Sequence, residues 1–151
     1  MAANAERIAM SDSSGIRKLG PQLPVWAARA SSFFLLQGAF LLVAYAVLGF
    51  DTDPDTFPNG LRLDPIHAAV HLVWGAIGTW IGFRRPEFAL GFIFAFSGFY
   101  IALAALGTFA PPEYHCGMQL RREENTFHWI VGPLALALAL VALLTSSGGK
   151  E

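Results

Sequence analysis

The chain has 151 residues, of which 54% are hydrophobic and 14% charged, and its formal net charge is −1. An ordinary soluble domain has about 45–50% apolar and about 25% charged residues, so this composition favours an integral membrane protein. The basic residues are too few and too scattered for a nucleic-acid surface, and no pattern indicates a soluble substrate.

Four stretches of the chain contain no Asp, Glu, Lys or Arg: residues 30–50, 65–83, 88–112 and 125–149. Each is about as long as the ~20 residues that cross a bilayer core of ~30 Å. Helices of a soluble bundle would carry a charged face, which these stretches lack. The sequence therefore predicts one all-α, four-helix transmembrane domain over residues 25–145, with helices at about 25–49, 65–83, 87–110 and 126–144.

The two ends of the chain lie outside this domain. Residues 1–24 show no sustained hydrophobic period, which predicts a mobile tail, and residues 146–151 form a second, short tail. Most basic residues fall on the side of the two tails: Arg7, Arg17, Lys18, Arg29, Arg84, Arg85 and Lys150. By the positive-inside rule both termini are cytoplasmic, in a multi-pass protein of the cell's inner membrane, and the four histidines lie on or near the outer face.

The second predicted helix begins with a clear signal. Asp64 before Pro65 is typical of an N-cap followed by proline at the first helical position. Five residues then fall near one stripe of this helix: His67, His71, Gly75, Gly78 and Gly82. Ionisable side chains in a membrane face the protein interior, and small residues let helices approach closely, so the stripe should face another helix.

The third predicted helix carries a similar row of small residues: Gly91, Ala95, Gly98, Ala102 and Ala105. We expect this row to pack inside the bundle. If so, faces rich in phenylalanine would be left for lipid or for a larger partner: Phe33, Phe34, Phe40, Phe92, Phe94, Phe96 and Phe99.

An internal repeat relates the two halves of the chain. Asp64 precedes His67 by three positions, and Asn125 precedes His128 in the same way, which predicts a second N-cap at Asn125. The halves would be helix hairpins related as parallel repeats, an arrangement that brings His67 and His128 together. Tyr45, at a similar depth to His71, is the expected hydrogen-bond partner of that histidine.

Four segments carry a resemblance to a known family: YAVLGF, DPIHAAVHLVWGAIG, GFIFAFSGFYIALAALG and ENTFHWIVG. Over roughly residues 33–144 the chain resembles the bacterial four-helix membrane protein family catalogued as domain of unknown function 4383. The most specific part is the pattern of His67, His71, Leu72 and Gly75, together with His128. The resemblance implies a fold and a membrane location, and it brings no activity, cofactor or partner.

The histidines leave several interpretations open. They can be packing residues with satisfied hydrogen bonds, or a zinc or copper site in which His67, His71 and His128 are joined by His115 or Cys116. A haem or chlorophyll-type macrocycle would need His71 and His128 on its opposite faces. The single cysteine excludes an intrachain disulfide.

No nucleophile and base, phosphate loop or carboxylate pair is placed at membrane depth, so the sequence does not indicate an enzyme. The sequence favours a non-enzymatic membrane protein, a structural or accessory subunit whose partners are the lipid bilayer and other membrane protein subunits. Metal or macrocycle binding is the alternative function.

Overall fold

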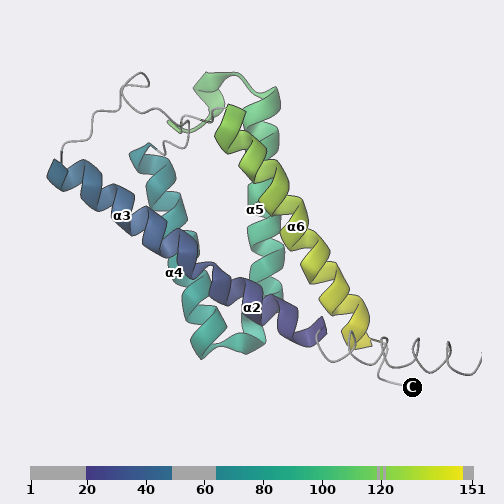
Figure 1. Cartoon of the computed structure of the whole chain (residues 1–151). Helices are drawn as coiled ribbons and strands as arrows, with labels where there is room; N and C mark the ends of the chain where they lie inside the picture. Colours follow the sequence, from purple (N-terminus) through teal and green to yellow (C-terminus); the bar gives the residue numbers. More distant parts are fainter. Residues whose placement is uncertain (1–19, 49–63, 119, 121, 148–151) are drawn as a thin grey trace, which may run out of the picture.

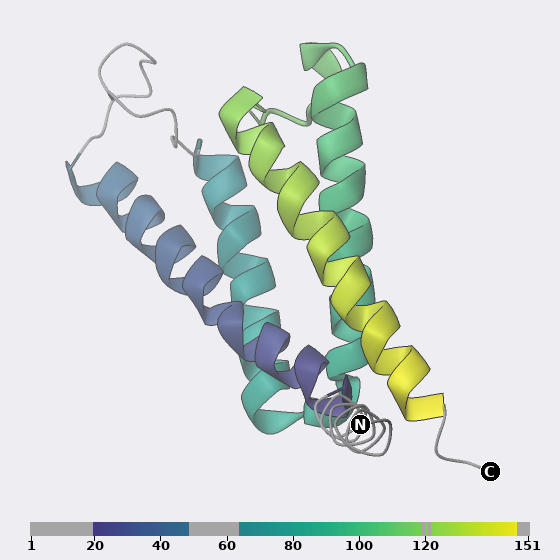
Figure 2. The same cartoon turned by 45° about the vertical axis from the view of Figure 1, so that its right-hand side comes forward.

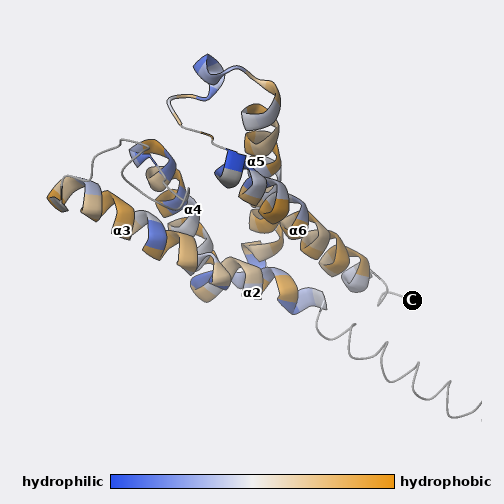
Figure 3. Cartoon of the chain, turned by 45° about the horizontal axis from the view of Figure 1, so that its top comes forward, coloured by the Kyte–Doolittle hydropathy of each residue, from blue (hydrophilic) through white to orange (hydrophobic). Residues whose placement is uncertain are grey.

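The computed structural model describes residues 20–48, 64–118, 120 and 122–147. All regular secondary structure in these residues is helical. Four helical segments are long and apolar enough to cross a membrane: Gly20–Val47, Pro65–Arg84, Pro86–Phe109 and Glu124–Ser146. Hydrophobic residues run along the helices and hydrophilic residues lie mainly near their ends (Figure 3), as expected of membrane-spanning segments. The prediction of an all-α fold with four helices able to span a membrane is therefore confirmed for the described residues.

The first segment consists of η1 (Gly20–Gln22), α2 (Leu23–Ala30) and α3 (Ser32–Leu48). Only Ser31 separates α2 from α3, and its backbone is itself helical, with its N–H donating to the carbonyl of Ala27 at 3.2 Å. The Ser31 hydroxyl donates to the carbonyl of Ala28, a local bond that competes with regular helical geometry. The helix predicted from residue 25 begins earlier in the structure, because residues 20–24 are helical rather than part of a tail. Residues 1–19 and 148–151 of the predicted tails lie outside the described residues.

Helix α4 (Pro65–Arg84) agrees closely with its prediction. The Asp64 side chain accepts hydrogen bonds from the backbone N–H groups of Ile66 and His67, each at 2.9 Å, so the predicted N-cap is confirmed. A tight turn through η2 (Pro86–Phe88) leads to α5 (Ala89–Phe109). The short η3 (Pro112–Tyr114) follows at the other end.

Helix α6 (Arg122–Ser147) begins before the residue 126 that the sequence predicts. Asn125 therefore lies inside the first turn and is not the N-cap. Its side-chain amide donates to the carbonyl of Ala104 at 3.1 Å and to the hydroxyl of Thr108 at 2.8 Å. Both acceptors belong to α5. A polar group in an apolar environment needs a partner, and here the neighbouring helix supplies it.

The helices pack as two closely associated pairs, α3 with α4 and α5 with α6, while α2 contacts α4, α5 and α6 (Figure 1). The start of α2 and the end of α6 lie together, and α3 and α6 diverge toward the opposite end (Figure 2). That opposite end, where α4 and α6 begin, is called the histidine end below.

The glycine stripe of α4 packs against α2 and α3, as predicted. A Cβ on Gly75 would meet backbone atoms of Leu35, one on Gly78 would meet the Ser31 hydroxyl, and one on Gly82 would meet Arg29. All three glycines are buried. These small residues let the first and second segments approach closely.

The expected packing of the third segment is wrong. Gly91 and Gly98 are exposed, and a Cβ at either position would have no neighbour within 4 Å. The opposite face of α5 is buried instead, through Phe92, Phe96 and Tyr100. Large aromatic rings fill the space between helices at this point, so the small residues face outward. Of the phenylalanines expected outside, Phe34, Phe92 and Phe96 are in the core, whereas Phe33 and Phe40 are exposed.

Candidate metal centre

Three histidines meet at the histidine end. His67 and His71 lie one turn apart at the start of α4, and His128 lies near the start of α6. They expose only 0%, 2% and 1% of their surfaces, respectively. One ring nitrogen from each can be chosen so that all three lie within 4.8 Å of one another. The structure thus brings together the three histidines that the sequence predicted as one cluster.

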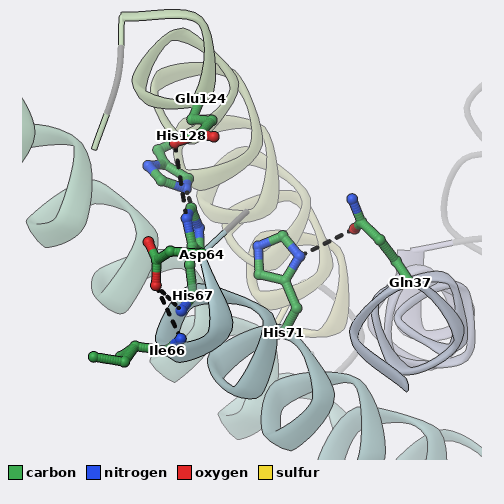
Figure 4. Close-up of polar contacts among 7 residues, drawn as sticks. All are labelled: Gln37, Asp64, Ile66, His67, His71, Glu124 and His128. Atoms are coloured by element: carbon green, nitrogen blue, oxygen red, sulfur yellow. Dashed lines mark hydrogen bonds and ion pairs between the residues drawn. The ribbon is translucent and has the colours of Figure 1, made fainter. Parts of the chain in front are cut away.

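The closest pair joins the two helices. The Nε2 atoms of His67 and His128 are 3.2 Å apart, in a hydrogen bond in which one imidazole donates and the other accepts (Figure 4). Two nitrogen ligands of a tetrahedral zinc ion, each with a Zn–N bond of about 2.05 Å, are separated by about 3.3 Å. The pair therefore already has the spacing of two ligands of one ion.

His71 is oriented by the first segment. Its Nδ1 lies 3.0 Å from the Oε1 atom of Gln37 on α3. An amide oxygen can only accept, so Nδ1 carries the proton and Nε2 presents a bare lone pair. This Nε2 is buried and has no hydrogen-bond partner among the described residues. Figure 4 shows it on the side of the ring that faces His67 and His128. The expectation that Tyr45 bonds His71 is corrected, because Gln37 takes that place.

Glu124 adds a buried carboxyl group beside the cluster. Its side chain is 2% exposed, and its Oε2 lies 4.0 Å from Nδ1 of His67, which makes no hydrogen bond within the described residues. A small movement would bring the two into hydrogen-bond contact, the arrangement in which a carboxylate orients a ligating histidine. Asp64, which caps α4 one turn before His67, is also buried. Two carboxylates and three imidazoles make this region favourable for a cation.

A cavity of about 230 Å³ adjoins the cluster and is called the histidine cavity. It lies between α3, α4 and α6. The residues that line it are the three histidines with Phe33, Gln37, Glu124 and Phe127. The imidazoles therefore face a space that can hold a further ligand, rather than being enclosed on all sides.

The other two predicted ligands do not join the cluster. Nε2 of His115 donates to the carbonyl of Ala110 at 3.0 Å, within the segment that links α5 to α6. Cys116 is exposed, and its Sγ is 3.7 Å from the carbonyl of Tyr114. In the part of the chain that is described, neither residue belongs to the group that could hold an ion. Short local bonds hold both side chains within this linking segment.

Three residues of the site were not predicted from the sequence: Gln37, Tyr100 and Glu124. Tyr100 is the one for which the sequence holds a signal. It is fully buried, and its ring centroid lies 5.5 Å from that of His128. Its spacing of eight residues from Phe92 on an aromatic face was the available signal.

Comparison of the chain with protein-family models, with curated proteins and with solved structures finds no match. The family resemblance drawn from the residues accordingly stays a prediction. Function has to be argued from the geometry of the site.

Proposed function

We propose that this chain is an integral membrane protein that binds a transition-metal ion, zinc or copper, through His67, His71 and His128. The observation that carries the proposal is the convergence of three buried imidazoles, with ring nitrogens within 4.8 Å of one another, from two different helices. Imidazole nitrogen is a preferred ligand of both metals.

The surroundings of the ligands support the same function. Gln37 holds His71 in the tautomer that presents Nε2, and Glu124 lies behind His67. A hydrogen bond from the far ring nitrogen to an oxygen acceptor, as His71 makes to Gln37, is typical of metal-binding histidines. For both Nε2 atoms to hold an ion, the proton between His67 and His128 has to move to Nδ1 of the ring that carried it, and binding should weaken as the pH falls because a protonated imidazole has no lone pair. Three protein ligands leave a fourth position open, as in zinc sites that take an external ligand.

A bare ion is better supported than a haem or chlorophyll-type macrocycle. The ring centroid of His67 lies 4.9 Å from that of His71 and 5.1 Å from that of His128. His67 thus packs against both of the histidines that would have to flank a porphyrin, and a macrocycle held between His71 and His128 would have to displace it. To bind an ion, the three imidazole rings need only move slightly toward one another.

We place the protein in the cytoplasmic membrane with both tails inside and the metal site near the outer face. Arginines at the end opposite the histidines support this orientation. Arg29 lies over the ring of Trp26 at 5.1 Å, and Arg85 over that of Trp80 at 6.0 Å. Aromatic rings with adjacent cations are typical of a membrane interface, and an excess of cations is typical of its cytoplasmic side.

The test is a metal titration of protein purified in mild detergent and stripped with a chelator. Wild-type protein should bind equimolar zinc, and the variants His71→Ala and His128→Ala should lose it. His115→Ala is the matched control, since it removes a buried histidine outside the cluster. Circular dichroism should show the same helix content in all four proteins. Absence of zinc and copper binding, or equal loss in His115→Ala, would overturn the assignment.

An accessory subunit of a larger membrane complex is the second candidate function. The observation in its favour is the outward row of small residues on α5, Gly91, Ala95, Gly98 and Ala102, all exposed. Such rows support close contact with another helix in lipid. Cysteine crosslinking from position 98 in native membranes, with position 73 on the exposed face of α4 as control, would reveal or exclude a neighbour there.

A further inference from the structure

A second cavity lies next to the histidine cavity, further from the histidine end. Its volume is about 230 Å³, and its walls are apolar apart from Ser31. Residues of α2, α5 and α6 line it, among them Ala27, Ala30, Leu134 and Leu138. Two spaces of similar size thus follow one another along the side of the molecule between the first segment and α6.

The two cavities lie along one face of α6, although no residue lines both of them. On α6, residues 124, 127 and 128 line the histidine cavity, and residues 131, 134, 135 and 138 line the second one. These positions recur every three or four residues and form one face of the helix. From residue 124 to 138 this face is about 21 Å long at 1.5 Å per residue. The cavities adjoin at Phe34 and Phe127, whose ring centroids are 6.1 Å apart.

The groove formed by these cavities is polar at one end only. At the histidine end it contains Gln37, Glu124 and the three imidazoles, including the buried Nε2 of His71 that has no hydrogen-bond partner among the described residues. Away from that end its walls are aliphatic and aromatic. This polarity fits an elongated amphiphile with its head at the histidines and its chain directed toward α2.

The walls of the histidine cavity and the buried Nε2 of His71 point to the chemistry of the head group. Phe33 and Phe127 present aromatic surfaces, which favour a flat ring. A hydroxyl on that ring can donate to a bare imidazole nitrogen or occupy the open position of a metal ion.

We propose that the groove binds a neutral lipophile with a hydroxylated aromatic ring and a long hydrocarbon chain, the chemical class of membrane quinols. The ring hydroxyl oxygen takes the fourth position of the ion held by His67, His71 and His128, and the chain lies along the second cavity. The placement of the ring hydroxyl on the ion rests on the proposed function, whereas the placement of the hydrocarbon chain rests on the second cavity.

The experiment measures binding of decylhydroquinone and of unsubstituted hydroquinone to zinc-loaded protein in nanodiscs, with empty nanodiscs as the reference. Zinc excludes electron transfer, because the ion is not redox active. In Ala30→Trp the indole should fill the second cavity and weaken binding of decylhydroquinone about tenfold or more, as expected if a few methylene groups lose their contacts. Its zinc content and its binding of unsubstituted hydroquinone should stay at the wild-type values.

Ala102→Trp is the matched control, because it places the same side chain on the exposed face of α5, and it should bind both probes like wild type. Leu134→Trp fills the groove from α6 and serves as the second variant if Ala30→Trp fails to fold. Equal binding of decylhydroquinone to wild type and to the groove variants would overturn the proposal while leaving the metal site intact.

Equally potent displacement of decylhydroquinone by phosphatidylglycerol would assign the groove to a phospholipid and also overturn it. If wild-type protein binds no zinc, the placement of the ring hydroxyl fails together with the proposed function. Binding of decylhydroquinone to the same variants in metal-free protein then tests the placement of the hydrocarbon chain.

Discussion

The Nε2 atoms of His67 and His128 lie 3.2 Å apart across two helices, although 61 residues separate the two histidines in the chain. In the absence of an ion they share one proton, and with an ion they would both be ligands. This contact between α4 and α6 is therefore central to any function of the histidine end.

Zinc should stabilise the folded protein through this cluster. At a free zinc concentration about 100 times the dissociation constant, binding to the native state alone adds about 2.7 kcal/mol to the free energy of unfolding. The measurement is denaturant unfolding in micelles with and without zinc. The same addition to His71→Ala should leave the unfolding midpoint unchanged, and an equal shift in both proteins would indicate binding elsewhere.

Gln37→Leu should weaken zinc binding about 10- to 100-fold, because the substitution removes the acceptor that fixes the tautomer of His71. Gln22→Leu, the same change at an exposed position in η1, is the control and should bind zinc like wild type. An unchanged affinity in Gln37→Leu would mean that this hydrogen bond does not orient the ligand.

Gly75→Ala should destabilise the protein by about 1–3 kcal/mol, the usual cost of overpacking. The added Cβ would meet backbone atoms of Leu35, which cannot rotate away as a side chain could. Gly98→Ala adds the same methyl group where nothing lies within 4 Å and should change the free energy of unfolding little. Equal effects of the two substitutions, measured by unfolding in micelles, would contradict the packing of α4 on the first segment.

Asn125→Asp distinguishes the two roles considered for this residue. Aspartate is a good N-cap but lacks the amide donor that joins α6 to Ala104 and Thr108. We expect it to cost about 1 kcal/mol, like Asn125→Ala, since interhelical bonds in membranes contribute about 0.6 kcal/mol each. Thr126→Ala, at the exposed neighbouring position, serves as the control. Full stability of Asn125→Asp would restore the interpretation of residue 125 as a cap.

Reporter fusions test the proposed orientation. A reporter at Lys150 should be cytoplasmic and one at Gly60 should be outside, because positive charges near the ends of short loops stay in the cytoplasm. Both positions lie outside the described residues, so the experiment depends on topology alone. The same sidedness at both positions would contradict the predicted membrane crossings.

The sequence by itself determined those features that depend on local composition and spacing. The absence of charges over about 20 residues identifies a membrane segment whatever it packs against, and all four segments were found in this way. Asp64 before Pro65 specifies the start of α4 through bonds between near neighbours. The spacing of four between His67 and His71 is likewise enough to place both imidazoles on one face of that helix.

Only the tertiary structure decided which face of a uniformly apolar helix turns inward. Along α5 both the small residues and the phenylalanines form continuous rows, and hydropathy does not distinguish them, because lipid and the protein interior are equally apolar. The aromatic row is buried, and Gly91 and Gly98 face outward. The partners of His71 and His67, namely Gln37 and Glu124, also depend on how the first segment and α6 cross α4. The internal repeat was enough to predict that His67 and His128 meet, but these other contacts follow from shapes that fit together in three dimensions, and no pattern in the sequence records them.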